Sequence, residues 1–229
     1  MPLGGYIIPT LTIMFARKQS MPSSHDAIRP TPSKASTGTR TNNASLTNGH
    51  HGPKHHHIWL VTGPAGCGKS TVAKHLATVF DVPFIEGDEF HPVANIEKMR
   101  NGIPLTDADR WEWLTVLREE SLRQLKAGNN GVVLTCSALK RKYRDVIRVA
   151  PYFSPDIRLH FIYLHAPEEV LLSRVAARRG HFMGAGMVHS QFDILEPPTE
   201  DELDVISIDV TGPIEKVNQE VFLKASGKL

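Results

Sequence analysis

The chain has 229 residues, 41% of them hydrophobic, and a formal net charge of +2 at pH 7. This length and hydrophobic content favour one domain with a substantial core plus additional sequence, rather than two full domains. The basic excess comes from the first 57 residues, because the rest of the chain carries 20 basic and 23 acidic residues. We therefore expect no nucleic-acid partner.

Residues 6–16 form the longest apolar stretch near the start of the chain. This stretch is too short to span a bilayer and contains Pro9, so we expect no membrane partner. Two cysteines, Cys67 and Cys136, are too few for a disulfide framework, which favours a reducing, cytoplasmic compartment. Arg17 and Lys18, with few acidic residues nearby, leave a mitochondrial transit segment as the alternative.

The first quarter of the sequence differs in composition from the rest. Residues 20–54 are mostly Ser, Thr, Pro, Asn, Gly and His, with almost no periodic apolar positions. Such a segment cannot bury enough surface to offset the entropy lost on ordering. We predict a disordered tail over residues 1–56 and one folded domain over residues 57–229.

A glycine-rich stretch, GPAGCGKST at residues 63–71, follows an apolar run and precedes a segment with helical spacing. This is the strand, loop and helix context of a Walker A phosphate-binding loop, whereas a bare glycine-rich turn would bind nothing. Lys69 would reach the β- and γ-phosphates, and Ser70 or Thr71 would place a hydroxyl near Mg²⁺. The predicted ATP-binding residues of the loop are Gly63, Pro64, Ala65, Gly66, Cys67, Gly68, Lys69, Ser70 and Thr71.

The next apolar run, residues 82–85, predicts a short buried strand that ends just before Asp88. Ligands of open parallel sheets bind outside the carboxyl ends of the strands. Asp88 is therefore placed where a phosphoryl acceptor would lie. The alternative is a carboxylate that only forms a turn or caps a helix.

Strand and helix patterns alternate through the remaining sequence. Helices are predicted over residues 93–101, 107–127, 138–149, 167–179 and 213–224, and strands over 132–136, 159–164 and 203–210. This alternation indicates an α/β fold, with a five-stranded parallel sheet covered by helices on both faces. Residues 181–198 contain two glycines and two prolines and are predicted to form a mobile lid. The tryptophans Trp59, Trp111 and Trp113 are expected in the core.

Several blocks of sequence resemble the gluconokinase family. They include GDEFHP at residues 87–92, CSALKRKYRD at 136–145, RRGHFM at 178–183 and SQF at 190–192. The resemblance extends over about residues 57–225, and separate blocks in the same order are more specific than the phosphate loop. It implies the fold of small-metabolite P-loop kinases, related to shikimate kinase, and suggests a homodimer.

The resemblance also implies a reaction, the ATP-dependent phosphorylation of D-gluconate to 6-phospho-D-gluconate, which feeds the pentose phosphate pathway. Asp88 would orient or deprotonate the acceptor hydroxyl, and Lys69 and Arg174 would join it as catalytic residues. Arg178 would contact ATP. The acceptor-side residues implied in the same way, besides Asp88, are His91, Lys98, Arg110, Lys140 and Gln191.

Two points remain open in the sequence. The strand at residues 132–136 offers no aspartate for Mg²⁺, so a second contact to the metal would come from Asp88, another acid or water. Arg174 and Arg178 could instead be helix-end charges that complement the helix dipole.

The alternative functions are a kinase for another hydroxy acid and a non-catalytic, nucleotide-regulated binding protein. The presence of Lys69, Ser70 and Asp88 argues against the non-catalytic protein.

Overall fold

We describe residues 55–177 and 185–229 of a computed structural model of the chain. Nearly all of the predicted tail lies outside these residues, and so does Arg178. The boundary of the tail therefore stays a prediction. Within the described part of the chain, no helix is long and apolar enough to cross a membrane.

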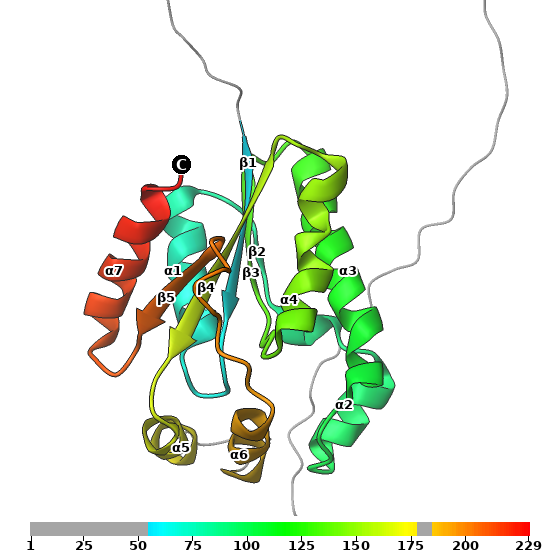
Figure 1. The fold of residues 1–229 in the computed structure, drawn as a ribbon, viewed down its shortest axis with the longest axis vertical. Coiled ribbons are helices and arrows are strands. Elements are labelled where there is room, and N and C mark those ends of the chain that lie inside the picture. The colour runs from blue at the N-terminus through cyan, green and yellow to red at the C-terminus, as the bar shows by residue number, and fades with distance from the viewer. Residues whose placement is uncertain (1–54, 178–184) are drawn as a thin grey trace, which may run out of the picture. The chain divides into compact units, whose positions relative to one another are not determined.

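Five parallel strands form one sheet, in the order β2-β3-β1-β4-β5. This arrangement confirms the predicted α/β fold with a parallel sheet (Figure 1). Because all strands are parallel, their carboxyl ends meet at one edge, where α5 and α6 lie. The strands are β1 (His56–Thr62), β2 (Phe84–Ile85), β3 (Gly131–Thr135), β4 (Ile157–His165) and β5 (Val205–Asp209).

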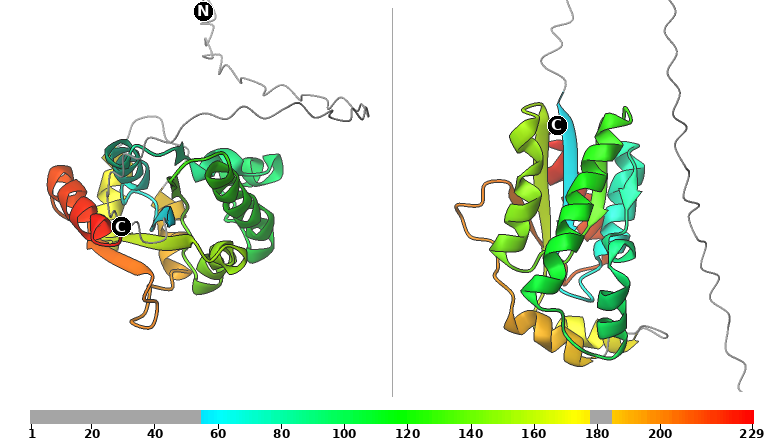
Figure 2. Two further views of the ribbon diagram at one scale, coloured as in Figure 1. Left: turned by 90° about the horizontal axis from the view of Figure 1, so that it is seen from above. Right: turned by 90° about the vertical axis from the view of Figure 1, so that its right-hand side faces the viewer.

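Helices cover both faces of the sheet, as Figures 1 and 2 show. On one face α1 (Lys69–Phe80) packs against α7 (Ile214–Ser226), and on the other α3 (Asp107–Lys126) packs against α4 (Arg141–Arg148). The remaining helices are α2 (Val93–Arg100), α5 (Glu168–Ala177) and α6 (Ala185–Asp193), with short 3-10 turns η1 (Gly87–Phe90) and η2 (Ala150–Phe153).

The alternation of side chains along β1 creates two hydrophobic cores. Trp59 and Val61 belong to the core shared with α1 and α7, whereas Ile58 and Leu60 belong to the core shared with α3 and α4. Successive side chains of a strand point to opposite faces, so a strand covered on both faces is apolar throughout. Trp111 corrects one expectation, because it is 39% exposed on α3 rather than buried.

The predicted lid segment is partly helical, which corrects its interpretation as a continuous loop. Residues 185–193 form α6, and Val188 on this helix is fully buried. Gly184 and Gly186 near its start obscured the helical spacing that follows them. Burial of the apolar Val188 side chain against the core compensates for the weak helix propensity of Gly186, which lies inside α6. The mobility of the segment stays a prediction.

A buried ion pair fixes α4 to the segment that precedes β5. Arg144 donates two hydrogen bonds to Glu202, of 2.7 and 2.6 Å, and the two side chains are 2% and 1% exposed. Arg148 donates a third, of 2.6 Å. Burial alone would raise the pKa of the Glu202 carboxyl, but these hydrogen bonds outweigh it and lower the pKa to about 2. Glu202 is therefore ionised and fully paired.

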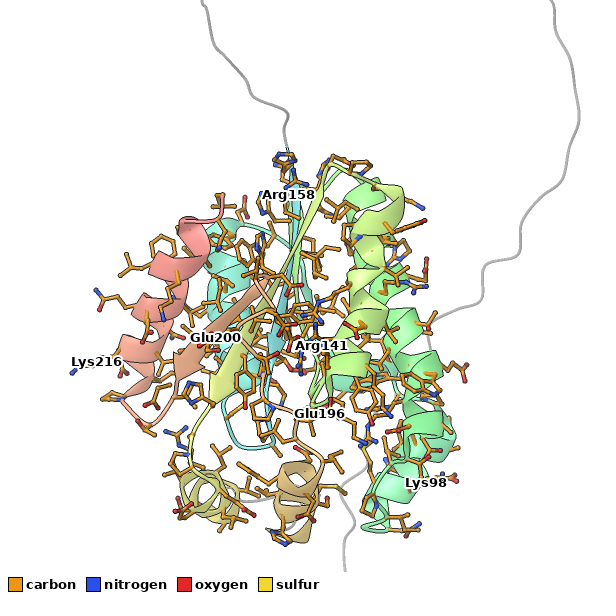
Figure 3. All side chains as sticks on the ribbon, in the orientation of Figure 1. Lys98, Arg141, Arg158, Glu196, Glu200 and Lys216 are labelled. Atoms are coloured by element: carbon orange, nitrogen blue, oxygen red, sulfur yellow. The ribbon has the colours of Figure 1, made fainter. Side chains whose placement is uncertain are left out.

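Replacing Glu202 by alanine is expected to reduce the free energy of unfolding by about 3–5 kcal/mol, because Arg144 would be left charged, buried and without its carboxylate. Urea denaturation measures this change. Glu200→Ala is the matched control, since Glu200 is exposed two residues away (Figure 3) and should change stability by less than about 0.5 kcal/mol. A loss below about 1 kcal/mol for Glu202→Ala would contradict the structural role of the pair.

Two histidines form a buried pair on neighbouring strands. His57 Nδ1 lies 3.1 Å from His160 Nε2, and the His160 ring stacks on Trp59 with centroids 4.1 Å apart. Burial, followed by the proximity of His57, lowers the pKa of His160 to about 4. Burial also lowers the pKa of His57. The pair is consequently neutral near pH 7.

This pair predicts a pH dependence of stability. Between pH 6.5 and about 4 the unfolded chain binds a proton that folded His160 does not, so the free energy of unfolding should fall as the pH falls through this window. His160→Phe, which keeps an aromatic ring beside Trp59, should make that fall shallower. Urea denaturation at several pH values, with His75→Phe on α1 as control, tests the expectation; an unchanged slope for His160→Phe would refute it.

Candidate active site

The phosphate loop connects β1 to α1 and takes a shape that requires glycine. Gly63, Gly66 and Gly68 have φ angles of 140, 84 and 93°, which side chains with a Cβ rarely adopt. A Cβ on Gly63 would also lie 2.3 Å from the carbonyl oxygen of Leu164 at the end of β4. The loop amides lead directly into the amino terminus of α1, the usual place for a phosphate group.

Lys69 and Ser70 begin α1 next to this loop. The Lys69 ammonium donates hydrogen bonds of 3.0 Å to the carbonyl oxygens of Gly63 and Pro64, so it lies across the loop. The Ser70 hydroxyl has no hydrogen-bond partner among the described residues and is half-buried. A hydroxyl in this position fits the Mg²⁺ ligand that such loops provide.

Asp88 lies on the 3-10 turn η1, directly after β2, and its neighbour Gly87 fixes that turn. The Gly87 N–H donates to Thr135 Oγ1 at 3.0 Å, and the Gly87 carbonyl accepts a 2.7 Å hydrogen bond from Trp113 Nε1. A Cβ on Gly87 would lie 1.9 Å from the carbonyl oxygen of Thr135, so only glycine fits. Asp88 itself is exposed and makes no hydrogen bond or ion pair within residues 55–177 and 185–229.

A cavity of about 340 Å³ lies beside the phosphate loop, at the carboxyl edge of the sheet. Its walls come from the loop, η1, α2, α3, α6 and the residues just before α3 and after β3. One part is charged and the rest is largely aliphatic. The lining residues are Ala65, Lys69, Asp88, His91, Ile96, Met99, Arg100, Pro104, Leu105, Arg110, Trp113, Ser137, Met187, Ser190, Gln191 and Ile194.

Arg110 is a buried cation in this cavity, only 9% exposed. Its guanidinium donates to the carbonyl oxygen of Leu105 and to Tyr143 Oη, and it lies 5.3 Å from the centroid of the Tyr143 ring. These partners are neutral, and no carboxylate in the described part of the chain pairs with Arg110. A buried charge without a counter-ion is costly, and an anionic ligand would offset that cost.

His91 forms the neutral wall of the cavity. Its ring stacks on Trp113 with centroids 4.0 Å apart, and burial lowers its pKa to about 4 in spite of nearby Asp88. Asn95 Nδ2 donates to the carbonyl oxygen of Asp109 at 2.7 Å and lies 3.5 Å from His91 Nδ1. Because an amide nitrogen can only donate, this contact favours the His91 tautomer in which Nδ1 accepts and Nε2 carries the proton.

Lys98 and Lys140, predicted on the acceptor side, do not line this cavity. Lys98 Nζ lies 2.6 Å from Asp109, and Lys140 Nζ lies 3.2 Å from Asp107, so both lysines pair with the first turn of α3. Figure 3 shows Lys98 on α2. The hydrogen bond from Lys98, followed by those from Thr106, lowers the pKa of Asp109 to about 2. The roles of these two lysines stay predictions.

Arg174 borders a second cavity, of about 380 Å³, instead of the first. Its guanidinium donates a 2.6 Å hydrogen bond to the carbonyl oxygen of Val210. The same cavity is lined by the end of the phosphate loop, the first turn of α1, the connection from β5 to α7 and the start of α7: Gly66, Cys67, Gly68, Thr71, Val210, Gly212, Ile214 and Val217. Burial raises the pKa of the Cys67 thiol, so this loop cysteine is protonated.

The structure brings together six of the predicted residues in the first cavity: Ala65, Lys69, Asp88, His91, Arg110 and Gln191. It adds residues that sequence reasoning missed, among them Arg100 and Ser137. Met187, Ser190, Gln191 and Ile194 also line it, and their spacing of i, i+3, i+4 and i+7 is that of one helix face. Two of these four residues, Ser190 and Gln191, are polar, so the spacing gives no apolar periodicity from which α6 could have been predicted.

Comparisons with known proteins identify the family of this chain. Residues 58–193 match a family model described as an AAA domain. A probable gluconokinase of Schizosaccharomyces pombe is 49% identical over 165 residues, covering 72% of this chain and 85% of that protein. The thermoresistant gluconokinase of Escherichia coli K12 is 41% identical over 162 residues, covering 71% and 89%.

A solved structure is similar to this chain in both fold and sequence. The crystal structure of a gluconokinase from Sinorhizobium meliloti 1021 matches with a TM-score of 0.63 and 39% identity, covering 75% of this chain and 91% of that one. Both sequence relatives are more than 40% identical to this chain and are matched over more than two thirds of their own length. The chain therefore belongs to the gluconokinase family of P-loop kinases.

Proposed function

We propose that this protein transfers the γ-phosphoryl group of ATP to D-gluconate, giving ADP and 6-phospho-D-gluconate for the pentose phosphate pathway. The observation that carries the proposal is the cavity beside the phosphate loop, where Asp88 and buried Arg110 face a ligand space and have no counter-ion among residues 55–177 and 185–229. A hydroxy acid supplies both a hydroxyl for a carboxylate and a carboxylate for an arginine. Relatives named gluconokinase support gluconate as that acid.

The phosphate loop would hold the nucleotide. Its amide groups at the start of α1 would bind the phosphates, and Lys69 would leave its two loop carbonyls to contact the β- and γ-phosphates. Ser70 would hold Mg²⁺, with Asp88, another acid or water as the second contact. The metal, when bound, supplies neutralisation of phosphate charge. The second cavity, with Arg174 at its wall, would hold the nucleoside part of ATP.

The first cavity would hold the acceptor. Arg110 presents a guanidinium whose planar fork matches a carboxylate, and its burial makes the interaction stronger than in water. His91, neutral near pH 7, would donate a hydrogen bond from Nε2 to a hydroxyl oxygen. Asp88 would accept the proton of the primary alcohol while that oxygen bonds to phosphorus, and the bond to the ADP oxygen breaks.

We also place the enzyme in the cytoplasm. Cys67 and Cys136 are both free and buried, and burial raises the pKa of both thiols, that of Cys136 to about 12. Protonated, inaccessible thiols suit a reducing compartment and need no disulfide partner. This placement is part of the proposal.

The purified protein should consume ATP with D-gluconate, and Lys69→Ala should reduce kcat by at least about a hundredfold, because a cation that meets charge developing on the phosphoryl group is lost. Coupled measurement of ADP release over a panel of sugar acids, shikimate and nucleosides tests the acceptor. Circular dichroism checks that Lys69→Ala folds. Turnover of another acceptor in preference to gluconate would reject the substrate, and an active Lys69→Ala protein would reject the site.

Asp88→Asn keeps the size of the side chain and one acceptor oxygen but removes its charge and basicity. If the acceptor hydroxyl is its main partner, kcat should fall by about 10²–10⁴-fold, while ATP affinity in the presence of Mg²⁺ changes little. If the metal is its main partner, the Mg²⁺ dependence should shift and ATP affinity should fall as well. Glu89→Gln, on the same turn, is the matched control. Normal kcat and normal Mg²⁺ dependence together would leave Asp88 as a turn residue.

A further inference from the structure

One hydrogen bond connects α6 directly to the phosphate loop. The backbone N–H of Ala65 donates to Gln191 Oε1 at 2.7 Å, joining residues 126 positions apart. Ala65 is only 4% exposed, so this amide would be unsatisfied and buried if Gln191 moved away without a replacement. The contact therefore holds one helix against the loop.

This hydrogen bond also fixes which way the Gln191 carboxamide faces. A backbone N–H can only donate, so the oxygen of the carboxamide faces the loop and its nitrogen faces elsewhere. Gln191 lines the first cavity together with Lys69, Asp88 and Arg110. Within the described parts of the chain, Gln191 Nε2 has no hydrogen-bond partner, so its two N–H groups remain available at the cavity.

The helix that carries Gln191 is anchored at both ends. Val188 is fully buried in the core, and His189 Nδ1 lies 2.9 Å from Glu168 Oε1 on α5. After the helix, the Glu196 N–H donates to the carbonyl oxygen of Leu139 at 2.9 Å, and the Arg141 N–H donates to Glu196 Oε2 at 2.8 Å; Figure 3 labels both charged residues. The position of Gln191 is thus set by packing on two sides of the site.

We propose that Gln191 bridges the two halves of the active site: its oxygen is held by Ala65 of the phosphate loop, and its Nε2 donates a hydrogen bond to an oxygen of the bound acceptor. The inference rests on the proposed function and adds to it a specific, oriented donor. It also explains why an amide and not a carboxylate stands here. Glutamate could accept from Ala65, but it would place a second negative charge near Asp88 and the phosphates.

Two substitutions separate this role from simple anchoring of α6. Gln191→Glu keeps an oxygen for the Ala65 N–H and loses the donor, whereas Gln191→Met keeps the length and loses both. If Nε2 binds the acceptor, both variants should lower kcat/KM for gluconate about tenfold or more, the loss expected for one hydrogen bond in a desolvated site. Direct binding of an ATP analogue to Gln191→Met, which adds no charge, should change less than about threefold.

Asp193→Asn is the matched control, because Asp193 is 63% exposed near the end of the same helix. It should keep kcat/KM within about twofold. Gluconate kinetics within about threefold of wild type in either Gln191 variant would overturn the proposal. An equal loss of ATP-analogue affinity and of kcat/KM in Gln191→Met would overturn it too, since that pattern indicates that Gln191 only holds the phosphate loop in place.

The same experiment keeps this inference distinct from the proposed function. Wild-type protein is assayed first over the acceptor panel, and failure to use gluconate rejects the substrate alone. The variants are then compared with wild type on the acceptor that is turned over. If the kcat/KM of the variants equals that of wild type, the proposed bridge by Gln191 is rejected. A selective loss of kcat/KM for the acceptor, with intact nucleotide binding, supports it.

Discussion

Close backbone packing of the phosphate loop against its neighbours is the constraint on which the active site depends. Gly63 lies so near the carbonyl oxygen of Leu164 that any Cβ would clash, and a Cβ on Gly66 would lie 3.0 Å from the Leu171 carbonyl oxygen on α5. The loop is thereby pressed between the ends of β1 and β4 and the side of α5. Because both cavities use loop residues as walls, this packing sets the position of each relative to the other.

Among the described residues, charged side chains that support the fold are paired with each other, whereas Asp88 and Arg110 of the active site are not. Arg144 and Glu202 are almost fully buried and satisfy each other, with Arg148 as a third partner. Arg110 is nearly as buried but meets only neutral atoms of the described residues, and Asp88 meets no cation there. A buried arginine left uncompensated for structural reasons alone would lower stability without benefit, whereas exposed Asp88 stays solvated. A ligand that binds only the folded state and supplies a carboxylate for Arg110 recovers that stability.

The sequence predicted best those features that follow from local spacing and from sheet topology. The run of apolar residues, the glycine spacing and the helix period identified β1, the loop and α1, and the parallel topology put Asp88 near the loop. Lys98 and Lys140 could not be assigned in this way, because their partners Asp109 and Asp107 lie 11 and 33 residues away. A sequence pattern places a lysine on an element, but it does not choose between an internal carboxylate and a ligand.

Helices α5 and α6 connect the two cavities physically. Arg174 on α5 forms part of the wall of one, and Gln191 on α6 forms part of the wall of the other. The helices pack on each other, and Leu171 and Val188 are fully buried in the same core cluster. Neither helix can shift without disturbing that core, which resists changes of even one methylene in volume. A displacement of the pair would therefore alter nucleotide and acceptor contacts together, so a mutation at one cavity can affect binding at both.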